Sequence, residues 1–497
     1  MPAANLDVGE YFKWFTAIAQ IPHGSYNERE LSNWLVRFAK ERDLAFIQDA
    51  LGNVCIKKMA SPGMEKAPSV ILQGHMDMVC VKEDGRAFDF FKDPIPLKVK
   101  GDFLTADGTT LGADNGIALA YILALLEAQN IPHPSLEAVI TVEEEVGMAG
   151  AAGFDVTPLA GEFFINIDSE EEGVFCVSCA GGRRCTITLP LRTVPVADIE
   201  GCDKQAFFRI RLGGLAGGHS GVEIDKQRGN ANRLMGRVLS TLAESCTVHL
   251  AAIAGGTASN VIPSESSAII YFKGDVFLLH SKLAAFAATF RNELRAADGG
   301  DLVLTATPVK PQSFVFTKET FEKVVATLTL IPDGVVSMDL GVAGQRMVES
   351  SSNLGQVIMQ DGAIVFDCLI RSNVGSRKEF LYSQIAAVAK LIGGEIKYFG
   401  DYSAWEYRPE SFLREVFHKA YVSLVGKEAK IEGIHAGLEC GLFYENFQAL
   451  GRHVDCISFG PDITGAHTVR ETVSISSVER TWRLLRKVLQ DLGNVKK

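Results

Sequence analysis

The chain of 497 residues is too long for one ordinary hydrophobic core and predicts at least two domains. Hydrophobic residues make up 47% of it and charged residues 22%, as is typical of a globular enzyme, and the formal net charge of −11 argues against nucleic acid as the main partner. The N-terminal residues show no signal-peptide pattern and no apolar run is long enough to span a bilayer, so we expect a cytoplasmic protein without membrane contact.

Ten cysteines are scattered along the chain, as is usual for reduced, mostly buried thiols of a cytosolic protein. Cys176 and Cys179 form a single CxxC pattern. A structural zinc site needs a second such pair, and a redox motif needs a thioredoxin-like context, so this pattern on its own predicts neither.

The first third of the chain alternates between helical and strand-like patterns. The expected elements, in chain order, are a helix at 9–20, a helix from about 28 to 41, a hairpin at 46–57, a strand at 70–74, a helix at 114–126, and strands at 136–142 and 163–167. The second helix follows Ser25-Tyr-Asn-Glu28, which predicts a capping box. Strands that alternate with helices are typical of an α/β fold, whose binding site lies at the carboxyl ends of its strands.

Polar side chains stand directly after these expected strands. His75 follows the first strand, Glu144 and Glu145 follow the second, and Asp168 follows the third. Asp114 opens the expected helix, where the simpler interpretation is an N-cap. Because the carboxyl ends of parallel strands meet at one edge of a sheet, we expect these side chains to lie close together.

From about residue 184 the pattern changes to strands that alternate apolar and polar side chains, as half-exposed antiparallel strands do. Helical patterns follow at residues 230–244, 281–296, 319–330 and 378–393. We therefore expect residues 184–395 to form an inserted α+β lid domain. Whether this domain consists of two similar halves stays open, because no residue-level repeat supports them.

The first pattern returns after about residue 395, with strands expected at 396–399, 429–433 and 455–460 and a closing helix at 477–492. His467 lies in the loop before that helix, so a role with the earlier carboxylates requires the C-terminal part to rejoin the first domain. The expected fold class is α/β. A discontinuous catalytic domain, formed by residues 1–183 and 396–497, has a mixed, mainly parallel sheet between helices and carries the inserted lid.

Imidazoles and carboxylates are the ligands that zinc prefers, with manganese or cobalt as substitutes. Asp77 stands two residues after His75 and can accept the second ring N–H of that histidine. Of the adjacent Glu144 and Glu145, one can bind metal while the other acts as a general base. Each motif alone is weak, because a run of Glu is more often a solvated surface. The order of the motifs and their shared position after strands predict a metal site. The set of candidate ligands is large enough to hold two metal ions.

This order of motifs resembles the two-zinc aminopeptidase and carboxypeptidase superfamily, and within it the aminoacyl-histidine dipeptidases of the bacterial carnosinase type. The resemblance runs nearly from end to end of the chain. It rests on the stretches at 73–79 (QGHMDMV), 109–116 (TTLGADNG), 143–148 (EEEVGM), 166–170 (NIDSE), 217–221 (GGHSG), 229–232 (GNAN), 434–442 (IHAGLECGL) and 460–467 (GPDITGAH).

The resemblance implies a dinuclear zinc centre. Asp114 would bridge the two ions, His75 and Asp168 would complete one site, and Glu145 and His467 would complete the other. An Asp at position 168, where related enzymes have Glu, goes in this superfamily with enzymes that act on a free amino end.

The resemblance also implies catalytic roles outside the ligand set. Glu144 would take a proton from a metal-activated water and pass it to the leaving amine, and Asp77 would orient His75. His219, from the inserted domain, would stabilise the oxyanion when the domains close; the simpler interpretation is a surface-turn histidine. The family often has a cis peptide after the bridging aspartate, here the bond from Asp114 to Asn115.

Four further residues are candidates for substrate binding. Asn260 and Arg371 look like clamp residues, with Arg371 suited to the carboxylate of a dipeptide, although an arginine at a strand end can also be a plain ion-pair partner. His435 and Glu439 are expected either to contact substrate or only to shape the pocket.

The sequence therefore predicts a metallo-dipeptidase that hydrolyses dipeptides with a free amino terminus, including Xaa-His and β-alanyl-histidine. Two alternatives remain: a deacylase or desuccinylase on the same scaffold, and a non-enzymatic binding protein. The latter would be expected to have lost metal ligands, which are all present here. Both a monomer and a homodimer remain open, because the strand edges of the inserted domain can pair two chains.

Overall fold

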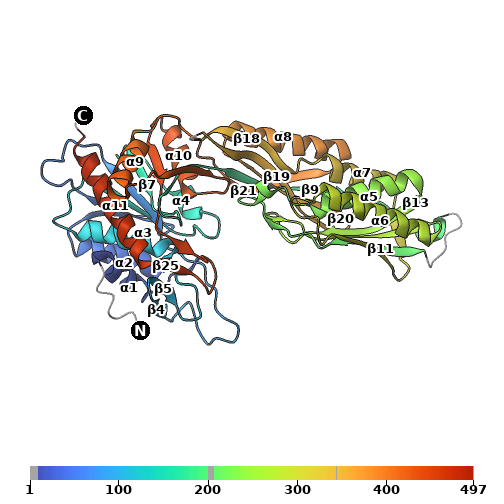
Figure 1. Ribbon diagram of the computed structural model, residues 1–497, viewed down its shortest axis with the longest axis horizontal. Helices are drawn as coiled ribbons and strands as arrows, with labels where there is room; N and C mark the ends of the chain where they lie inside the picture. Colours follow the sequence, from blue (N-terminus) through green and yellow to red (C-terminus); the bar gives the residue numbers. More distant parts are fainter. Residues whose placement is uncertain (1–8, 200–205, 343, 496–497) are drawn as a thin grey trace.

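The computed structural model describes residues 9–199, 206–342 and 344–495. Figure 1 shows two lobes side by side: the first contains both ends of the chain, in blue and red, and the second contains the green to orange middle. The mixed α/β architecture expected from the sequence is confirmed. Among the helices in the described ranges, none combines the length and apolar character needed to cross a bilayer.

The first lobe is built on a mixed sheet of order β1-β2-β6-β3-β7-β23-β8-β22. Its strands are β1 Ala45–Gln48, β2 Val54–Lys58, β3 Val70–His75, β6 Leu136–Thr141, β7 Phe163–Asn166, β8 Val174–Cys179, β22 Lys430–Ile434 and β23 Asp455–Ser458. β3 runs parallel to both β6 and β7, and β7 runs parallel to β23, so strands from both ends of the chain share the sheet.

Helices cover both faces of this sheet (Figure 1). One face packs on α1 Glu10–Ile18, α2 Arg29–Lys40, α3 Ala113–Glu127, α9 Phe412–Val425 and α11 Ile475–Gly493, and the other on α4 Ala149–Gly153 and α10 Glu439–Ala449. The strands alternate accordingly: Val70 and Leu72 belong to the first core and Ile71 to the second. A strand that is covered on both faces is buried throughout, as all six residues of β3 are.

A small sheet of order β24-β25-β5-β4 lies beside the main one and joins distant parts of the chain. Its strands are β4 Leu97–Lys100, β5 Phe103–Ala106, β24 Ile463–Thr464 and β25 Thr472–Ser474. β24 and β25 form an antiparallel hairpin, and β25 pairs with β5. The hairpin therefore holds the C-terminal segment against the loop that leads into α3.

The second lobe is an antiparallel sheet of order β16-β11-β15-β13-β19-β20-β9-β21, with β18 paired to β19. Its strands are β9 Gly181–Pro190, β11 Phe207–Gly213, β13 Thr247–Gly255, β15 Ser266–Lys273, β16 Val303–Pro308, β18 Gly334–Val342, β19 Gln345–Gln360, β20 Ala363–Ser372 and β21 Glu395–Tyr402. Its core includes residues of the helices α5 Ala231–Ser245, α6 Val276–Glu293, α7 Lys318–Leu330 and α8 Gly375–Ile392. Two short pairs, β10 Thr193–Pro195 with β17 Phe314–Phe316 and β12 Gly218–His219 with β14 Val261–Ile262, complete the described strands.

Two local expectations need correction. The strand expected at 396–399 is β21, which pairs with β9 of the second sheet, so the chain leaves that sheet only after Tyr402. Ser25 and Glu28 do not form a capping box on α2, because the residue before that helix makes no side-chain cap. The Ser25 hydroxyl donates instead to Asp77 Oδ2, 2.8 Å away.

A buried carboxylate joins two elements of the second lobe. Asp333 Oδ1 accepts hydrogen bonds from Leu354 N at 2.9 Å and from Asn230 Nδ2 at 2.8 Å. Asn230 itself caps the N-terminus of α5 through its side-chain oxygen. Burial raises the pKa of Asp333 to about 6, so ionisation of this group costs more in the folded chain than in the unfolded chain.

We expect Asp333→Asn to stabilise the protein at pH 7 and to have little effect near pH 4. The folded pKa lies above the unfolded value, so the folded state holds the proton more tightly and stability falls as pH rises from about 4 to about 6. Asparagine keeps the oxygen that both donors use and carries no charge. Thermal unfolding at several pH values measures this, and a Tm difference that does not grow between pH 4 and pH 7 would contradict it.

Candidate metal centre

The side chains that follow β3, β6 and β7 meet at one edge of the main sheet. β3 lies between β6 and β7 and parallel to both, so His75, Glu144, Glu145 and Asp168 come to the same edge. Asp114 enters from the first turn of α3, where its backbone is not helical, with φ −82° and ψ 103°. The peptide bond from Asp114 to Asn115 is cis, as the resemblance implied.

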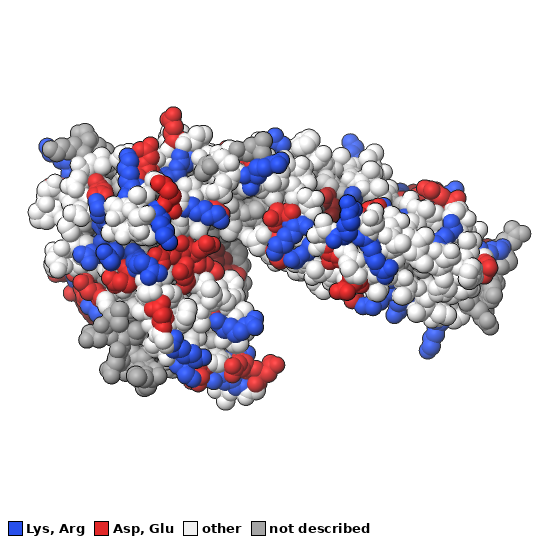
Figure 2. Space-filling model, in the orientation of Figure 1, with Lys and Arg blue, Asp and Glu red and all other residues white. Residues whose placement is uncertain are grey.

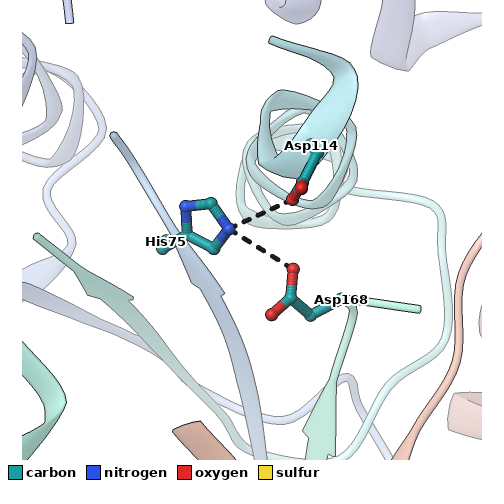
Figure 3. Close-up of side chains that lie close together, drawn as sticks. All are labelled: His75, Asp114 and Asp168. Atoms are coloured by element: carbon teal, nitrogen blue, oxygen red, sulfur yellow. Dashed lines mark hydrogen bonds and ion pairs between the residues drawn. The ribbon is translucent and has the colours of Figure 1, made fainter. Parts of the chain in front are cut away.

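His75 faces two carboxylates (Figure 3). Its Nε2 lies 3.2 Å from Asp114 Oδ1 and 3.4 Å from Asp168 Oδ1. His75 is 1% exposed, so its ring is almost fully buried.

His467 approaches Asp114 from the other side. It lies in the loop between β24 and β25, with a left-handed backbone at φ 62°. Its Nε2 lies 3.2 Å from Asp114 Oδ2 and 3.0 Å from Glu145 Oε1. The two oxygens of Asp114 therefore face two different histidines, each accompanied by one further carboxylate.

The donor set fits divalent metal ions. The ligand atoms of His75, Asp114 and Asp168 lie within 4.8 Å of one another, and so do those of Asp114, Glu145 and His467. Glu145 Oε1 is buried and lies 3.0 Å from His467 Nε2, but it makes no hydrogen bond with the residues that the structure describes, which leaves carboxylate capacity for a cation in the second group. Nitrogen and oxygen ligands in this arrangement suit zinc, manganese or cobalt.

The charges of the centre are strongly coupled. Burial disfavours a charged His75, but the nearby carboxylates of Asp168 and Asp114 outweigh it and raise the pKa of the imidazole. The hydrogen-bonded carboxylate of Asp114 and the neighbouring carboxylate of Glu145 raise the pKa of His467 to about 11. Burial raises the pKa of Asp168 to about 6, and burial together with neighbouring carboxylates raises that of Glu144 well above its ordinary value. A cation at this point would lower the pKa of each of these carboxyl groups.

Asp77 is buried behind His75, and it contacts both that ring and the backbone of the glutamate segment. His75 Nδ1 lies 3.0 Å from the backbone carbonyl of Asp77 and 3.5 Å from its carboxylate Oδ1. The carboxylate accepts hydrogen bonds from Glu144 N at 3.0 Å and Glu145 N at 3.2 Å. Asp77 therefore fixes the segment that carries the expected base and one ligand, besides its expected role of orienting His75.

Glu439 lies beneath the centre and not on its open side. The residue is fully buried, and its Oε2 accepts hydrogen bonds from the Thr141 hydroxyl, at 2.8 Å, and from the Gln73 amide. Burial raises its pKa to about 8. Because Glu439 does not line the cavity described next, the alternative of shaping the pocket fits it better than substrate contact.

A cavity of about 1070 Å³ opens over the centre and reaches the second lobe. Its lining includes His75, Asp114, Glu144, Glu145, Asp168 and His467 of the first lobe together with His219 of the second. His219 Nδ1 accepts from the amides of Gly221 and Val222, both at 3.2 Å, so its Nε2 carries the hydrogen of a neutral ring. Figure 2 shows acidic side chains gathered on the first lobe beside the recess between the lobes.

Arg371 lies next to His219 and close to the cavity. A Cβ placed on Gly221 would lie 2.9 Å from His219 Cε1 and 3.2 Å from Arg371 Nε, so both side chains pack against this glycine. Arg371 is 6% exposed, and its Nε has no hydrogen-bond partner in the described part of the chain. Its Nη1 donates to the hydroxyl of Tyr402 at 2.6 Å. A buried guanidinium with unused donor capacity is suited to an anionic group.

The structure places the other two expected substrate residues away from the cavity lining. His435 is buried, with Nε2 2.7 Å from Ser351 Oγ and Nδ1 3.2 Å from Asn373 Oδ1, and it lines a neighbouring cavity of about 360 Å³. Asn260 has an exposed side chain, and its carbonyl accepts from Ser220 N at 2.9 Å.

Three residues of the site were not identified from the sequence. Tyr402 binds Arg371, Glu170 lines the cavity with a pKa that burial raises to about 7, and Glu471 binds backbone amides next to Asp114. Glu170 stands two residues after Asp168 and could have been suspected from that position. Cys176 and Cys179 are buried free thiols, and neither belongs to a possible metal-binding group among the described residues.

Comparison with known proteins bears on this centre. The profile of peptidase family M20/M25/M40 matches residues 71–491. A protein of Escherichia coli (strain K12) named cytosol non-specific dipeptidase is 38% identical over 480 residues, which cover 96% of each chain. The crystal structure of aminoacylhistidine dipeptidase from Vibrio alginolyticus superposes with a TM-score of 0.89 at 34% identity, over 98% of this chain and 97% of that one.

A more distant structure shares the fold. A tripeptidase from Staphylococcus aureus superposes with a TM-score of 0.55 at 15% identity, over 98% of this chain and 100% of that one.

We expect zinc to stabilise protein that a chelator has freed of metal. An ion that binds only the folded chain adds about 2.7 kcal/mol of stability when its free concentration is about 100 times Kd. Differential scanning calorimetry with and without zinc measures the shift in Tm, and His467→Ala should reduce that shift. His418→Gln is the control, because His418 pairs with Glu428 away from the centre. No rise in Tm with zinc would contradict the assignment of the centre.

Proposed function

This chain belongs to peptidase family M20/M25/M40, and we propose that it is a dipeptidase whose two metal ions lie on either side of Asp114. The full-length relatives named above are dipeptidases, which supports peptide-bond hydrolysis in short substrates. One observation carries the dinuclear assignment: Asp114 Oδ1 faces His75 while Asp114 Oδ2 faces His467. We propose zinc as the metal, held by His75, Asp114 and Asp168 at one site and by Asp114, Glu145 and His467 at the other.

Zinc ions in such a centre lower the pKa of water and polarise the scissile carbonyl. The protein supplies the proton transfer through Glu144. This carboxylate lies within 4.8 Å of ligand atoms of both His75 and Glu145 and lines the cavity, so it can reach a nucleophilic water. Glu144 accepts a proton from the attacking water and delivers it to the leaving nitrogen, while Asp77 holds its backbone in place.

The second lobe provides groups for the other parts of the substrate. Hydrogen bonds from two backbone amides to Nδ1 fix the ring of His219. Its Nε2–H is then suited to donate to the oxyanion that forms at the scissile carbonyl. We propose that Arg371 binds the substrate carboxylate with the donors that Tyr402 does not use. Closure of the lobes over a dipeptide would bring these two groups to the centre and exclude water.

We further propose substrates with a free amino end, among them Xaa-His and β-alanyl-histidine. The name of the Vibrio alginolyticus structure supports histidine dipeptides, and the name of the Escherichia coli relative supports a broader range and a location in the cytosol. A homodimer also remains a proposal, because β16 and β21 form the edges of the second sheet and an edge strand can pair with a second chain.

We expect Glu144→Gln to lower kcat on alanyl-histidine by about 10² to 10⁴ while two metal ions stay bound, because glutamine cannot accept the proton. Glu143→Gln is the matched control: Glu143 belongs to the same triplet but to none of the possible metal-binding groups that the described residues form. Metal content by mass spectrometry and steady-state kinetics provide the two measurements. Wild-type turnover in Glu144→Gln would contradict the mechanism.

The same assay separates a dipeptidase from an amidase on this scaffold. The wild-type enzyme should hydrolyse alanyl-histidine and β-alanyl-histidine and leave N-acetyl and N-succinyl amino acids intact. A preference for the acylated amino acids would overturn the assignment of substrate.

A further inference from the structure

Glu471 binds the backbone that carries Asp114. Its Oε2 accepts hydrogen bonds from Leu111 N at 2.8 Å and Gly112 N at 3.2 Å. Its Oε1 accepts from Ala113 N at 2.8 Å and Asp114 N at 3.3 Å. Four consecutive amides therefore converge on one carboxylate, and that carboxylate is 2% exposed.

These amides have no local side-chain partner at the start of α3. Gly112, the residue before the helix, is left-handed, with φ 70°, and provides no side-chain cap. Asp114 and Asn115 depart from helical geometry, so the first turn of α3 is irregular. Unpaired amides at a helix start attract a negative charge, and hydrogen bonds to a buried carboxylate are stronger than those between neutral groups. Glu471 thus replaces the missing cap with a charged group from a distant part of the chain.

The same hairpin supplies His467. Glu471 lies four residues after His467, just before β25, and the two residues are held together by the pairing of β24 with β25. The carbonyl of Glu471 also accepts from the hydroxyl of Thr105 at 2.9 Å. His467 Nε2 approaches the Asp114 carboxylate, while Glu471 binds the Asp114 amide. One hairpin therefore holds Asp114 by both its side chain and its backbone.

We propose that Glu471 is a positioning residue of the dinuclear centre, which sets the Asp114 carboxylate relative to His467 and so allows both ions to bind. This inference rests on the proposed function, since it requires Asp114 and His467 to be metal ligands. Glu471 touches neither the proposed metal-ligand atoms nor the proposed substrate position. It acts through the backbone of Asp114, and its loss should weaken metal binding more than it weakens the fold.

The test compares Glu471→Gln with Glu137→Gln. Glutamine at 471 offers one oxygen to the four amides and turns its own N–H groups toward the others. Glu137 is the matched control: it is 4% exposed, and its Oε2 accepts from Ala160 N and Gly161 N, both at 2.8 Å, at a place outside the centre. Calorimetric titration of zinc into chelator-treated protein gives the number of ions bound and their Kd, and thermal unfolding of the metal-free proteins gives Tm.

We expect both variants to lower the metal-free Tm, but only Glu471→Gln to weaken zinc binding, by about 10- to 100-fold. A zinc Kd within twofold of wild type in Glu471→Gln, or equal weakening in Glu137→Gln, would overturn the proposal. If wild type itself binds no zinc, the proposed function fails instead. Should Glu471→Gln not fold, Thr105→Val keeps the carboxylate and removes the bond to the Glu471 carbonyl. It should then weaken zinc binding at least threefold, and an unchanged Kd would count against the proposal.

Discussion

Repulsion among buried carboxylates is the constraint on which this structure depends. Asp114, Glu144, Glu145 and Asp168 converge on one cavity, where each negative charge loses part of its hydration. These carboxylates raise the pKa of both His75 and His467, so protonated imidazoles would offset part of the negative charge. Divalent cations offset it more fully and let the imidazoles act as neutral ligands. Without metal, the electrostatic free energy of these clustered carboxylates is unfavourable. Metal binding relieves this repulsion, which favours strong binding.

The fold brings the proposed ligands together by joining distant segments. Three parallel strands deliver side chains to one edge of the main sheet, and a C-terminal hairpin adds His467 from the other side of Asp114. The blue and red segments in Figure 1 share the first lobe for this reason. The second lobe contributes His219 from the short β12–β14 pair and Arg371 from β20 of the large antiparallel sheet. The centre and the groups that we propose for substrate binding therefore belong to lobes with separate cores.

Much of the fold could be predicted from the sequence, and so could His75, Glu145 and Asp168 as candidate ligands, because each of the three follows an apolar run of recognisable period. Asp114 and His467 follow no such run, and their proposed roles rested on the resemblance to a known family. The α/β architecture depends on that periodicity and is confirmed. Predictions from local sequence patterns were wrong where tertiary contacts determine the hydrogen bonding. Ser25 has the spacing of a capping box, but its hydroxyl donates to Asp77. Glu471 could not be found, because it binds amides 357 to 360 residues earlier in the chain, and no sequence spacing records such a contact. Glu439 lies in one of the stretches that resemble the family, but only the structure shows that its side chain is beneath the centre.

In the proposed centre, two cations share Asp114. Anomalous diffraction at the zinc edge, from crystals grown with zinc, measures this directly. We expect two peaks about 3.5–4 Å apart on either side of the Asp114 carboxylate, one beside His75 and Asp168 and the other beside His467 and Glu145. A single peak, or two peaks of which only one contacts Asp114, would contradict it.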